Sequence, residues 1–483
     1  MKLNAASLLL SNGREGDTAL LCGGQTRTFG QLRDAVARAA AVWCRRGLKP
    51  GDRIAVAVPD GFAWVDAVLG CIWAGGVAVP INPRFAENDW AAVLEEAGFR
   101  FVLAEADHRL PRAHDTSVVT PDELIADQGA CDPVEAMQVE PTQPGMWAYS
   151  SGTSGKPKAI VHGHRFAIEI ERIIREVVGV DRSDRLFATS KLFFAYPQTN
   201  SLFAGLKLGA SVVLDPRWPT GADVAATVSA TRPTVLCSVP SLYRNLLKEG
   251  LAEELVRNGV RRFVSAGEAL SVDLREEWRR HTGASIVNGY GASETLVLVL
   301  TDRDDGRGLQ PSPGISVTPL NKGTDTSPTR VCIGGSAIAL GYLNRPLAQA
   351  EHFRDGMFCP SDLFEIRENG SFRFVGREGT LVKVHGRWVD LVAIEEKLAV
   401  VCPEVLEAAA VLVPDADGLD TIAVFYVPRS GVGQADLEAS LRAHTSSMPS
   451  YQRPRQFHAV DTLPRTPTGK LLRRRLQEIH LNS

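Results

Sequence analysis

Short runs of β-branched and other apolar residues alternate with longer amphipathic stretches through most of the chain. The clearest repeat begins with the strand pattern Arg53–Val58, passes through a turn into the helical pattern Phe62–Trp73, and continues to the strand pattern Val77–Val79. Thr234–Val239 and Arg262–Ser265 show the same kind of strand before small or turn-forming residues. This order of elements is typical of parallel sheets covered by helices, so the pattern predicts an α/β fold.

The pattern changes near Gly376, where a segment rich in charge and glycine begins. The elements expected beyond it are a helix at Ala393–Val401, strands at Ala408–Val413 and Thr421–Val427, and a helix at Gln434–Thr445. We therefore expect two domains. Residues 1–378 would form a large N-terminal domain of packed, parallel-rich sheets with covering helices, and residues 379–483 a small, mobile α+β domain.

Composition and charge narrow the function classes. The chain has 483 residues, of which 44% are hydrophobic and 23% are charged, as in an average globular protein. Its formal net charge is −3, so it lacks the excess of basic residues that is common in nucleic-acid-binding proteins. The most apolar stretch, Ala67–Pro80, is shorter than the ~20 residues of a membrane span. The eight cysteines include no pair at metal-ligand spacing, which favours reduced thiols. We expect a soluble, cytoplasmic protein that binds neither nucleic acid nor membrane.

The segment most informative about chemistry is Tyr149–His164, which reads YSSGTSGKPKAIVHGH. Small residues let backbone N–H groups and hydroxyls crowd around phosphate oxygens, and lysines add positive charge. The spacing differs from that of a Walker A loop, because only two residues separate Gly152 from Gly155 and Pro157 follows Lys156. Taken alone, the segment fits either a phosphate-binding loop of another kind or a polar surface loop.

Together with four further motifs, this loop resembles the adenylate-forming superfamily of acyl- and aryl-CoA synthetases, peptide-synthetase adenylation domains and luciferases. The matching motifs, in the order of the family, are SSGTSGKPKA at 150–159, NGYGASET at 288–295, PSD at 360–362, Gly376-Arg377, and PTGK at 467–470. The resemblance covers nearly the whole chain. It departs from the family at Ala159, Ser361 and Gly379, where Gly, Gly and a hinge Asp or Lys are usual.

The resemblance implies that the protein joins a carboxylic acid to AMP with release of pyrophosphate, using ATP and Mg²⁺, and then passes the acyl group to a thiol. Catalysis would depend on Lys470, on Ser293 at the α-phosphate, and on Glu294 as the Mg²⁺ ligand. The residues implied in ATP binding are Ser151, Gly152, Thr153, Ser154, Gly155, Lys158, Gly267, Glu268, Ala269, Asn288, Gly289, Tyr290, Asp362 and Arg377. Among them, Tyr290 would stack on adenine, and Asp362 would bind the ribose hydroxyls beside Arg377.

The family also works by rotation of its C-terminal domain, which presents the lysine in one pose and a thiol tunnel in the other. By resemblance, Gly379 would be the hinge and Gly386 would lie at the tunnel. Glycine tolerates nearly any backbone conformation, so rotation at position 379 is feasible.

The acid pocket resembles that of benzoate-CoA ligases in Lys191–Tyr196 (KLFFAY), Phe263–Leu270 and 386–389. A flat slot between backbone and aromatic rings suits a planar ring better than a flexible chain. The residues implied in the pocket are Phe194, Ala195, Tyr196, Ser265, Ala266, Gly291 and Val297. An ordinary core role for these aromatic residues remains the alternative, and the direction of Lys191 stays open.

CoA is the first candidate for the thiol, and an acyl carrier protein in a natural-product pathway is the second. A variant would pass the acyl-adenylate to an amine or another nucleophile. From a different class, the chain could be a catalytically idle nucleotide-binding relative, although a scaffold would have no need of Glu294, Asp362, Arg377 and Lys470 together. We therefore expect an aryl-acid ligase.

Overall fold

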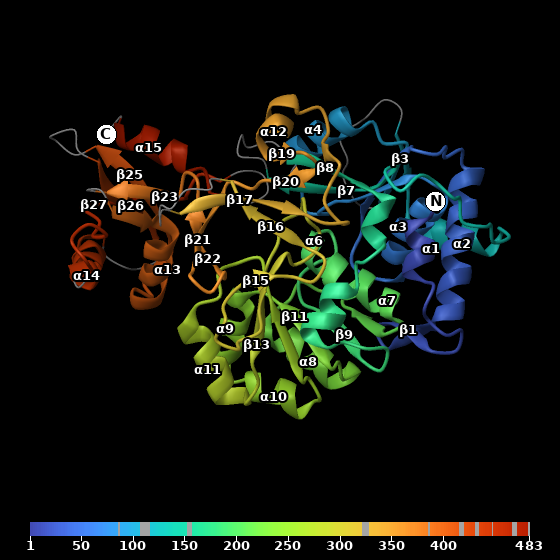
Figure 1. Ribbon diagram of the computed structural model, residues 1–483, viewed down its shortest axis with the longest axis horizontal. Helices are drawn as coiled ribbons and strands as arrows, with labels where there is room; N and C mark the ends of the chain where they lie inside the picture. The colour runs from blue at the N-terminus through green and yellow to red at the C-terminus, as the bar shows by residue number, and fades with distance from the viewer. Residues whose placement is uncertain are drawn as a thin grey trace.

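The computed structural model describes residues 1–85, 87–106, 116–151, 157–320, 328–384, 387–414, 420–429, 434–446, 448–465 and 471–481. Two large, mainly parallel sheets and a smaller antiparallel sheet form one body, and a small α+β unit lies at one end of it (Figure 1). Within these ranges, no helix is long and apolar enough to cross a membrane. The α/β fold with a large N-terminal part and a small C-terminal part agrees with the sequence prediction.

The first large sheet has nine strands, and its centre is parallel. In spatial order they are β15 (Gln310–Pro311), β14 (Leu300–Asp302), β13 (Ile286–Tyr290), β12 (Arg262–Ser265), β11 (Val235–Ser238), β9 (Arg185–Ala188), β10 (Ser211–Leu214), β1 (Thr18–Cys22) and β2 (Gln25–Thr28). Helices α8 (Gly221–Thr231), α9 (Pro240–Lys248), α10 (Ala252–Arg257) and α11 (Val272–Thr282) cover one face. The core between sheet and helices is built around the buried rings of Tyr243, Phe263 and Trp278.

The second large sheet has seven strands. They are β18 (Gly341–Tyr342), β8 (Pro157–Gly163), β7 (Pro144–Ser151), β4 (Val77–Pro80), β3 (Arg53–Ala57), β5 (Phe101–Ala104) and β6 (Ser117–Val119). Helix α4 (Glu87–Ala97) packs on one face. On the other side, the largest core contains α1 (Ala5–Leu9), α2 (Phe29–Arg45), α3 (Phe62–Trp73), α7 (Ala204–Leu208) and the π-helical segment η3 (Gln198–Phe203), and α5 (Pro121–Gly129) packs on α2 and α3.

Local sequence explains where these helices begin and end. Helix α2 starts with a capping box, in which the Thr28 hydroxyl accepts from the Gln31 N–H and the Gln31 side chain accepts from the Thr28 N–H. Helix α3 is buried along most of its length, and its one charged residue, Asp66, is paired with Arg27. The helix ends before Gly75, whose φ of 77° favours glycine. The helix predicted at Phe62–Trp73 is confirmed.

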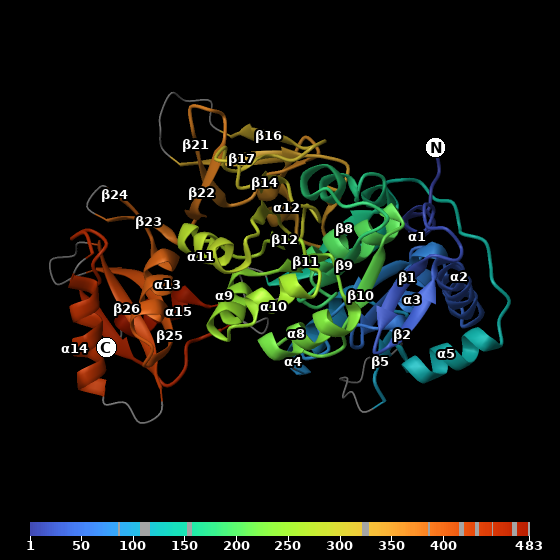
Figure 2. The same ribbon diagram turned by 90° about the horizontal axis from the view of Figure 1, so that it is seen from below.

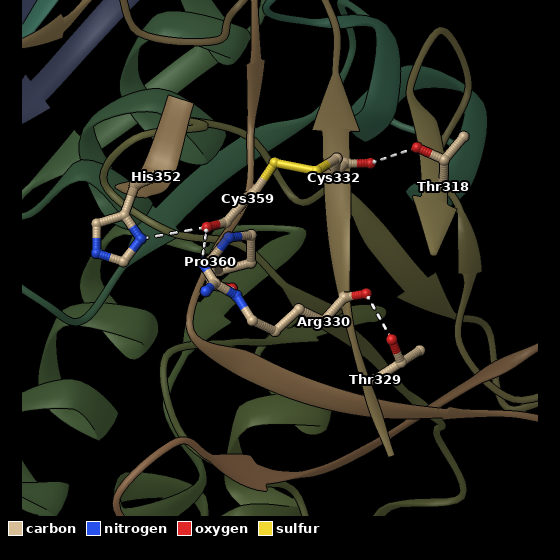
Figure 3. Close-up of a disulfide and its surroundings, with 7 residues drawn as sticks. All are labelled: Thr318, Thr329, Arg330, Cys332, His352, Cys359 and Pro360. Atoms are coloured by element: carbon tan, nitrogen blue, oxygen red, sulfur yellow. Dashed lines mark hydrogen bonds between the residues drawn. A yellow bond between two sulfur atoms is a disulfide. The ribbon is translucent and has the colours of Figure 1, made fainter. Parts of the chain in front are cut away.

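The antiparallel sheet is a feature that the sequence pattern did not predict, and two of its strands have only two residues each. It contains β16 (Ser316–Pro319), β17 (Thr329–Gly334), β19 (Phe353–Arg354), β20 (Met357–Phe358), β21 (Asp362–Ile366) and β22 (Phe372–Arg377), with α12 (Pro346–His352) before β19. Ile333 on β17 pairs with Phe358 on β20. That register places Cys332 opposite Cys359, with their Cα atoms 4.2 Å apart, and the two form a disulfide (Figure 3).

The prediction of reduced thiols is therefore wrong for Cys332 and Cys359. The pairing depends on strand register, and a separation of 27 residues in the chain gives no local signal of it. The other six cysteines are free.

The C-terminal unit has cores of its own. Its elements are β23 (Leu381–Val384), β24 (Arg387–Asp390), α13 (Leu391–Val401), β25 (Val405–Pro414), β26 (Asp420–Pro428), α14 (Gln434–Ser446), β27 (Gln456–Ala459) and α15 (Arg473–Leu481). The expected helices and strands are confirmed, with ends that differ by a few residues. Both views place this unit at one end of the molecule, next to β21 and β22 (Figures 1 and 2).

Candidate functional site

The glycine- and serine-rich segment joins two antiparallel strands. Tyr149 on β7 pairs with Ala159 on β8, and Ser150 pairs with Lys158. A strand follows the segment here, whereas a helix follows a Walker A loop, so the structure agrees with the exclusion of that motif. The proposed phosphate-binding residues Gly152, Thr153, Ser154 and Gly155 lie outside the described residues, as does the side chain of Ser151.

Lys158 and Glu294, two of the predicted site residues, form an ion pair with 3.5 Å between Nζ and Oε1. Tyr342 joins them from β18. Its hydroxyl donates to Glu294 Oε1 at 2.7 Å, and the Lys158 ammonium lies 3.6 Å from the centre of its ring. Burial lowers the pKa of Lys158 while the Glu294 carboxylate opposes that change. The cluster is thus a buried carboxylate held by one cation and one hydroxyl.

A tight turn after β13 positions Glu294. A Cβ on Gly291 would lie 2.6 Å from the Val297 carbonyl oxygen, so only glycine fits there. His162 Nε2 donates to the Ser293 carbonyl oxygen at 2.9 Å. Burial lowers the pKa of His162 to about 4, so the ring is neutral at neutral pH and its proton is on the nitrogen that faces the carbonyl. The Ala339 N–H donates to the Glu294 carbonyl oxygen at 2.9 Å.

A second cluster brings together Asp362, Arg377 and Tyr290, the residues that the resemblance assigns to the ribose and the adenine. Asp362 on β21 pairs with Arg377 on β22, and the Arg377 Nε lies 3.4 Å from Asp362 Oδ1. The Tyr290 hydroxyl, from β13, donates to Asp362 Oδ2 at 2.5 Å. The ring of Tyr290 packs against Phe364 and Phe374, so its position is fixed by apolar contacts as well.

The residues just before Asp362 are anchored on β17 (Figure 3). Arg330 Nε donates to the Pro360 carbonyl oxygen and Arg330 Nη2 to that of Cys359, both at 2.8 Å. The disulfide to Cys332 adds a covalent link at the same place. Asp362 therefore follows a segment with little freedom to move.

The aromatic segment expected to line an acid pocket is anchored at its start by a buried ion pair. Lys191 Nζ lies 3.2 Å from Asp60 Oδ2 and also donates to the Asp215 carbonyl oxygen at 2.5 Å. Burial raises the pKa of Asp60 to about 6, although Lys191 and the Leu192 N–H oppose the change. These contacts answer the open question about Lys191: it points to the Asp60 carboxylate, which neutralises its charge, and to the backbone of Asp215.

Within this segment, Tyr196 is fixed and Phe194 is exposed. The Tyr196 hydroxyl donates to the Val264 carbonyl oxygen at 3.0 Å, which holds the ring over β12. Phe194 is 53% exposed and packs on Phe193. Ala195 between them is half-buried.

The expected floor lies at the end of β12. Ser265 and Ala266 are buried, and Gly267 has a φ of 89°, which favours glycine. The Glu268 carboxylate accepts hydrogen bonds from the N–H and the hydroxyl of Ser241 at 2.9 Å each. Ala269 is exposed, Gly289 is buried, Val297 is buried in the largest core, and Asn288 Oδ1 has no hydrogen-bond partner among the described residues.

The hinge expected at Gly379 has a left-handed backbone, with a φ of 91°. The neighbouring Glu378 N–H donates to the Ser361 carbonyl oxygen at 2.9 Å, which connects this turn to the residue before Asp362. Lys470 and Gly386 lie outside the described residues.

Glu294 suits an Mg²⁺ ion that is held mainly by substrate phosphates. Mg²⁺ prefers oxygen ligands and commonly takes one or two carboxylates together with phosphate oxygens. Among the described residues, no cluster of three or more His, Cys, Asp or Glu side chains could hold a metal ion. Tyr342, His162 and the Cys332–Cys359 pair were missed in the sequence analysis, because no local pattern shows that they contact the predicted residues.

Comparisons with known proteins find matches over nearly the whole chain. The model of the AMP-binding enzyme family matches residues 11–343, and that of the AMP-binding enzyme C-terminal domain matches residues 394–470. The chain is 33% identical to a 3-hydroxybenzoate–CoA/4-hydroxybenzoate–CoA ligase of Thauera aromatica, over 97% of this chain and 95% of that protein. It is similar in structure to the anthranilate CoA ligase AuaEII in complex with anthranoyl-AMP, with a TM-score of 0.86, 26% identity, and coverage of 99% of this chain and 97% of the other. A benzoate CoA ligase from Burkholderia xenovorans LB400 gives a TM-score of 0.84 at 27% identity, covering 98% of this chain and 100% of the other.

Proposed function

The chain belongs to the family of AMP-binding enzymes, and on this premise we propose that it is an ATP-dependent ligase of aromatic, benzoate-like carboxylic acids. The acid is first joined to AMP, and the aryl group then passes to the thiol of CoA. The observation that carries the proposal is that the chain is similar to aryl-CoA ligases over nearly its whole length. The same chain also assembles the Glu294 and Asp362 clusters.

In the first step, a carboxylate oxygen of the acid attacks the α-phosphorus of ATP, and the bond to the bridging oxygen of pyrophosphate breaks. Both reactants are anions, so fixed positive groups and hydrogen-bond donors lower the barrier. We assign this role to Lys470, to Ser293 and to the loop at 151–155. Lys158 supports the loop from the adjoining strand.

Nucleotide binding divides between the two clusters. Asp362 accepts from the ribose hydroxyls, with Arg377 beside it and Tyr290 holding its other oxygen. The segments Gly267–Ala269 and Asn288–Tyr290 flank adenine. Glu294 would hold Mg²⁺, which would supply positive charge to the phosphates.

The aromatic acid lies against Phe194, Ala195 and Tyr196, over a floor of Ser265, Ala266 and Gly291, with Val297 as the far wall. The fixed Tyr196 ring and the backbone at the end of β12 offer flat surfaces, which suit a planar ring. Since Lys191 is paired with Asp60, this segment offers no cation for a second carboxylate.

In the second step, the CoA sulfur attacks the acyl carbon and AMP leaves. We propose that the unit 379–483 rotates at Gly379 between the two steps, and that the thiol enters past Gly386. The left-handed backbone of Gly379 supports this hinge. CoA is favoured over an acyl carrier protein because the similar proteins named above are CoA ligases. The cytoplasmic location expected from the sequence stays a prediction.

The test is acid-dependent ATP–pyrophosphate exchange without thiol, over a panel of benzoate, hydroxybenzoates, aminobenzoates, cinnamates, fatty acids and amino acids. We expect exchange with benzoates only, followed by thioester formation when CoA is added. Exchange with fatty acids would contradict the aryl pocket. Thioester formation with a carrier protein at micromolar concentrations, but with free CoA only at millimolar concentrations, would contradict the acceptor.

A further inference from the structure

Tyr342 contacts both charged residues of the Glu294 cluster, but the proposed reaction gives it no role. Its hydroxyl donates to Glu294 Oε1 at 2.7 Å, and Lys158 approaches the same oxygen. No hydrogen bond from the described residues reaches Glu294 Oε2. One carboxylate oxygen is therefore occupied by protein groups, and the other is left for a ligand.

The position of Tyr342 is fixed from several sides. Its strand β18 pairs with β8, the strand that carries Lys158, with Tyr342 opposite Ile160. The Tyr342 N–H donates to Gln349 Oε1 at 2.9 Å. The ring packs edge-on against Phe353 at 5.2 Å and His352 at 6.1 Å, between ring centres.

Gly341, the residue before Tyr342, lies close to helix α12. Gly341 has a φ of 145°, and a Cβ there would lie 2.1 Å from Gln349 Oε1. The positive φ favours glycine, and a side chain at this position would displace the Gln349 amide that accepts from the Tyr342 N–H. The backbone that aims the tyrosine is thus specified by its own neighbours.

The chemistry of the contact is asymmetric. A carboxylate oxygen can only accept a hydrogen bond, so in this contact the Tyr342 hydroxyl is the donor. The face of its ring attracts the Lys158 ammonium, which gives that cation a second partner besides the carboxylate. The Tyr342 hydroxyl therefore orients the Glu294 carboxylate, and the Tyr342 ring attracts the Lys158 ammonium that is paired with this carboxylate.

We propose that Tyr342 is a positioning residue for the Mg²⁺ site: its hydroxyl holds Glu294 in the orientation that binds the metal ion, and its ring shares the Lys158 ammonium with that carboxylate. This inference rests on the proposed function, in which Glu294 is the Mg²⁺ ligand. Hydrogen-bond partners of metal ligands commonly change metal affinity or activity by about 10–100-fold when they are removed.

The test is Tyr342→Phe, which removes the hydroxyl and keeps the ring. We expect the Mg²⁺ concentration for half-maximal ATP–pyrophosphate exchange to rise roughly 10–100-fold, with exchange recovering at saturating Mg²⁺. Calorimetric titration gives a readout independent of turnover. The gain in ATP affinity on adding Mg²⁺ should shrink, while ATP affinity measured in EDTA stays the same.

The matched control is Tyr243→Phe. Tyr243 is fully buried, and its hydroxyl donates to the carbonyl oxygens of Leu236 and Val264 on β11 and β12. This variant should lose a comparable amount of thermal stability without any change in Mg²⁺ dependence. An unchanged Mg²⁺ requirement in Tyr342→Phe, or an equal loss of ATP affinity with Mg²⁺ and with EDTA, would overturn the proposal.

Glu294→Gln separates this inference from the function on which it rests. If Tyr342 acts through Glu294, adding Tyr342→Phe to Glu294→Gln should have no further effect on the Mg²⁺ requirement. A weakened Mg²⁺ response in Glu294→Gln with a normal one in Tyr342→Phe would refute the positioning role alone. A normal Mg²⁺ response in Glu294→Gln would instead refute the assignment of Glu294 as the metal ligand.

Discussion

Replacing Lys191 with methionine should destabilise the protein in a way that depends on pH. The change removes the cation from Asp60, a carboxylate that is 6% exposed, and keeps a side chain of similar length. Breaking a buried pair on one side commonly costs about 3–5 kcal/mol, because an uncompensated charge stays buried. We expect a loss of that size in the free energy of unfolding at pH 8.

At pH 5 the loss should fall to about 1 kcal/mol, the scale of one hydrogen bond. In the wild type, burial raises the pKa of Asp60 to about 6, from an ordinary value near 4. Between about pH 4 and pH 6, Asp60 is therefore protonated in the folded state and ionised in the unfolded state. Stability from this group therefore falls as pH rises through about 4 to 6, by roughly 2–3 kcal/mol. Without Lys191 the pKa rises further, so Asp60 is protonated and uncharged at pH 5 in the variant.

Urea denaturation of Lys191→Met at pH 5 and pH 8 measures both losses, and Asp60→Asn/Lys191→Met is the matched control. Because the asparagine carries no charge at either pH, this site should contribute equally to the stability of the double variant at both, so its loss relative to the wild type should not grow between pH 5 and pH 8. Equal destabilisation of the single variant at pH 5 and pH 8 would refute the reasoning, since the cost would then come from packing. The KM for the aromatic acid should rise in the single variant as well, because Lys191 and Asp60 anchor the segment at 192–196.

Three further predictions concern the other parts of the site. Lys470→Ala should lower ATP–pyrophosphate exchange by roughly 10²–10³-fold and largely spare thioester formation from supplied aryl-adenylate, and equal loss in both half-reactions would refute its role. Tyr290→Phe removes a hydrogen bond to the Asp362 carboxylate, so kcat/KM for ATP should fall ~10–100-fold at constant KM for the acid, a split that steady-state kinetics measures. The double variant Cys332→Ala/Cys359→Ala removes the disulfide that closes a loop of 27 residues, so the free energy of unfolding should fall by ~3–4 kcal/mol. Dithiothreitol should cause the same loss in the wild type and have no effect on the variant.

The parts of the fold that follow a local period could be predicted from the sequence. Helix α3 and strands β3, β4 and β12 have clear patterns, and their observed ends lie within a residue or so of the expected ones. The antiparallel sheet could not be predicted in this way, because strands such as β19 and β20 contain only two residues each. The disulfide between its strands was missed because it depends on the register of those strands.

The candidate site was predictable as a set of residues but only partly as a set of contacts. Motifs identified Glu294, Asp362, Arg377 and Tyr290, and the structure brings the last three together. Tyr342 has no such motif in the residues around it, and its role appears only when β18 pairs with β8. Sequence patterns report neighbours along the chain, whereas the partners of a buried charge are neighbours in space.

The two charge clusters join all three sheets of the large domain. Glu294 follows β13 of the nine-stranded sheet, while Lys158 and Tyr342 lie on the seven-stranded sheet. Asp362 and Arg377 belong to the antiparallel sheet, and Tyr290 reaches Asp362 from β13. Glu294 therefore obtains its cation and its hydroxyl donor only when the two large sheets dock, and an undocked intermediate would leave that charge unpaired. Asp362 is paired with Arg377 within its own sheet and gains the Tyr290 hydrogen bond on docking. The arrangement couples completion of the fold to completion of the nucleotide site, so substitutions that loosen the contacts between sheets should weaken ATP binding before they unfold any one sheet.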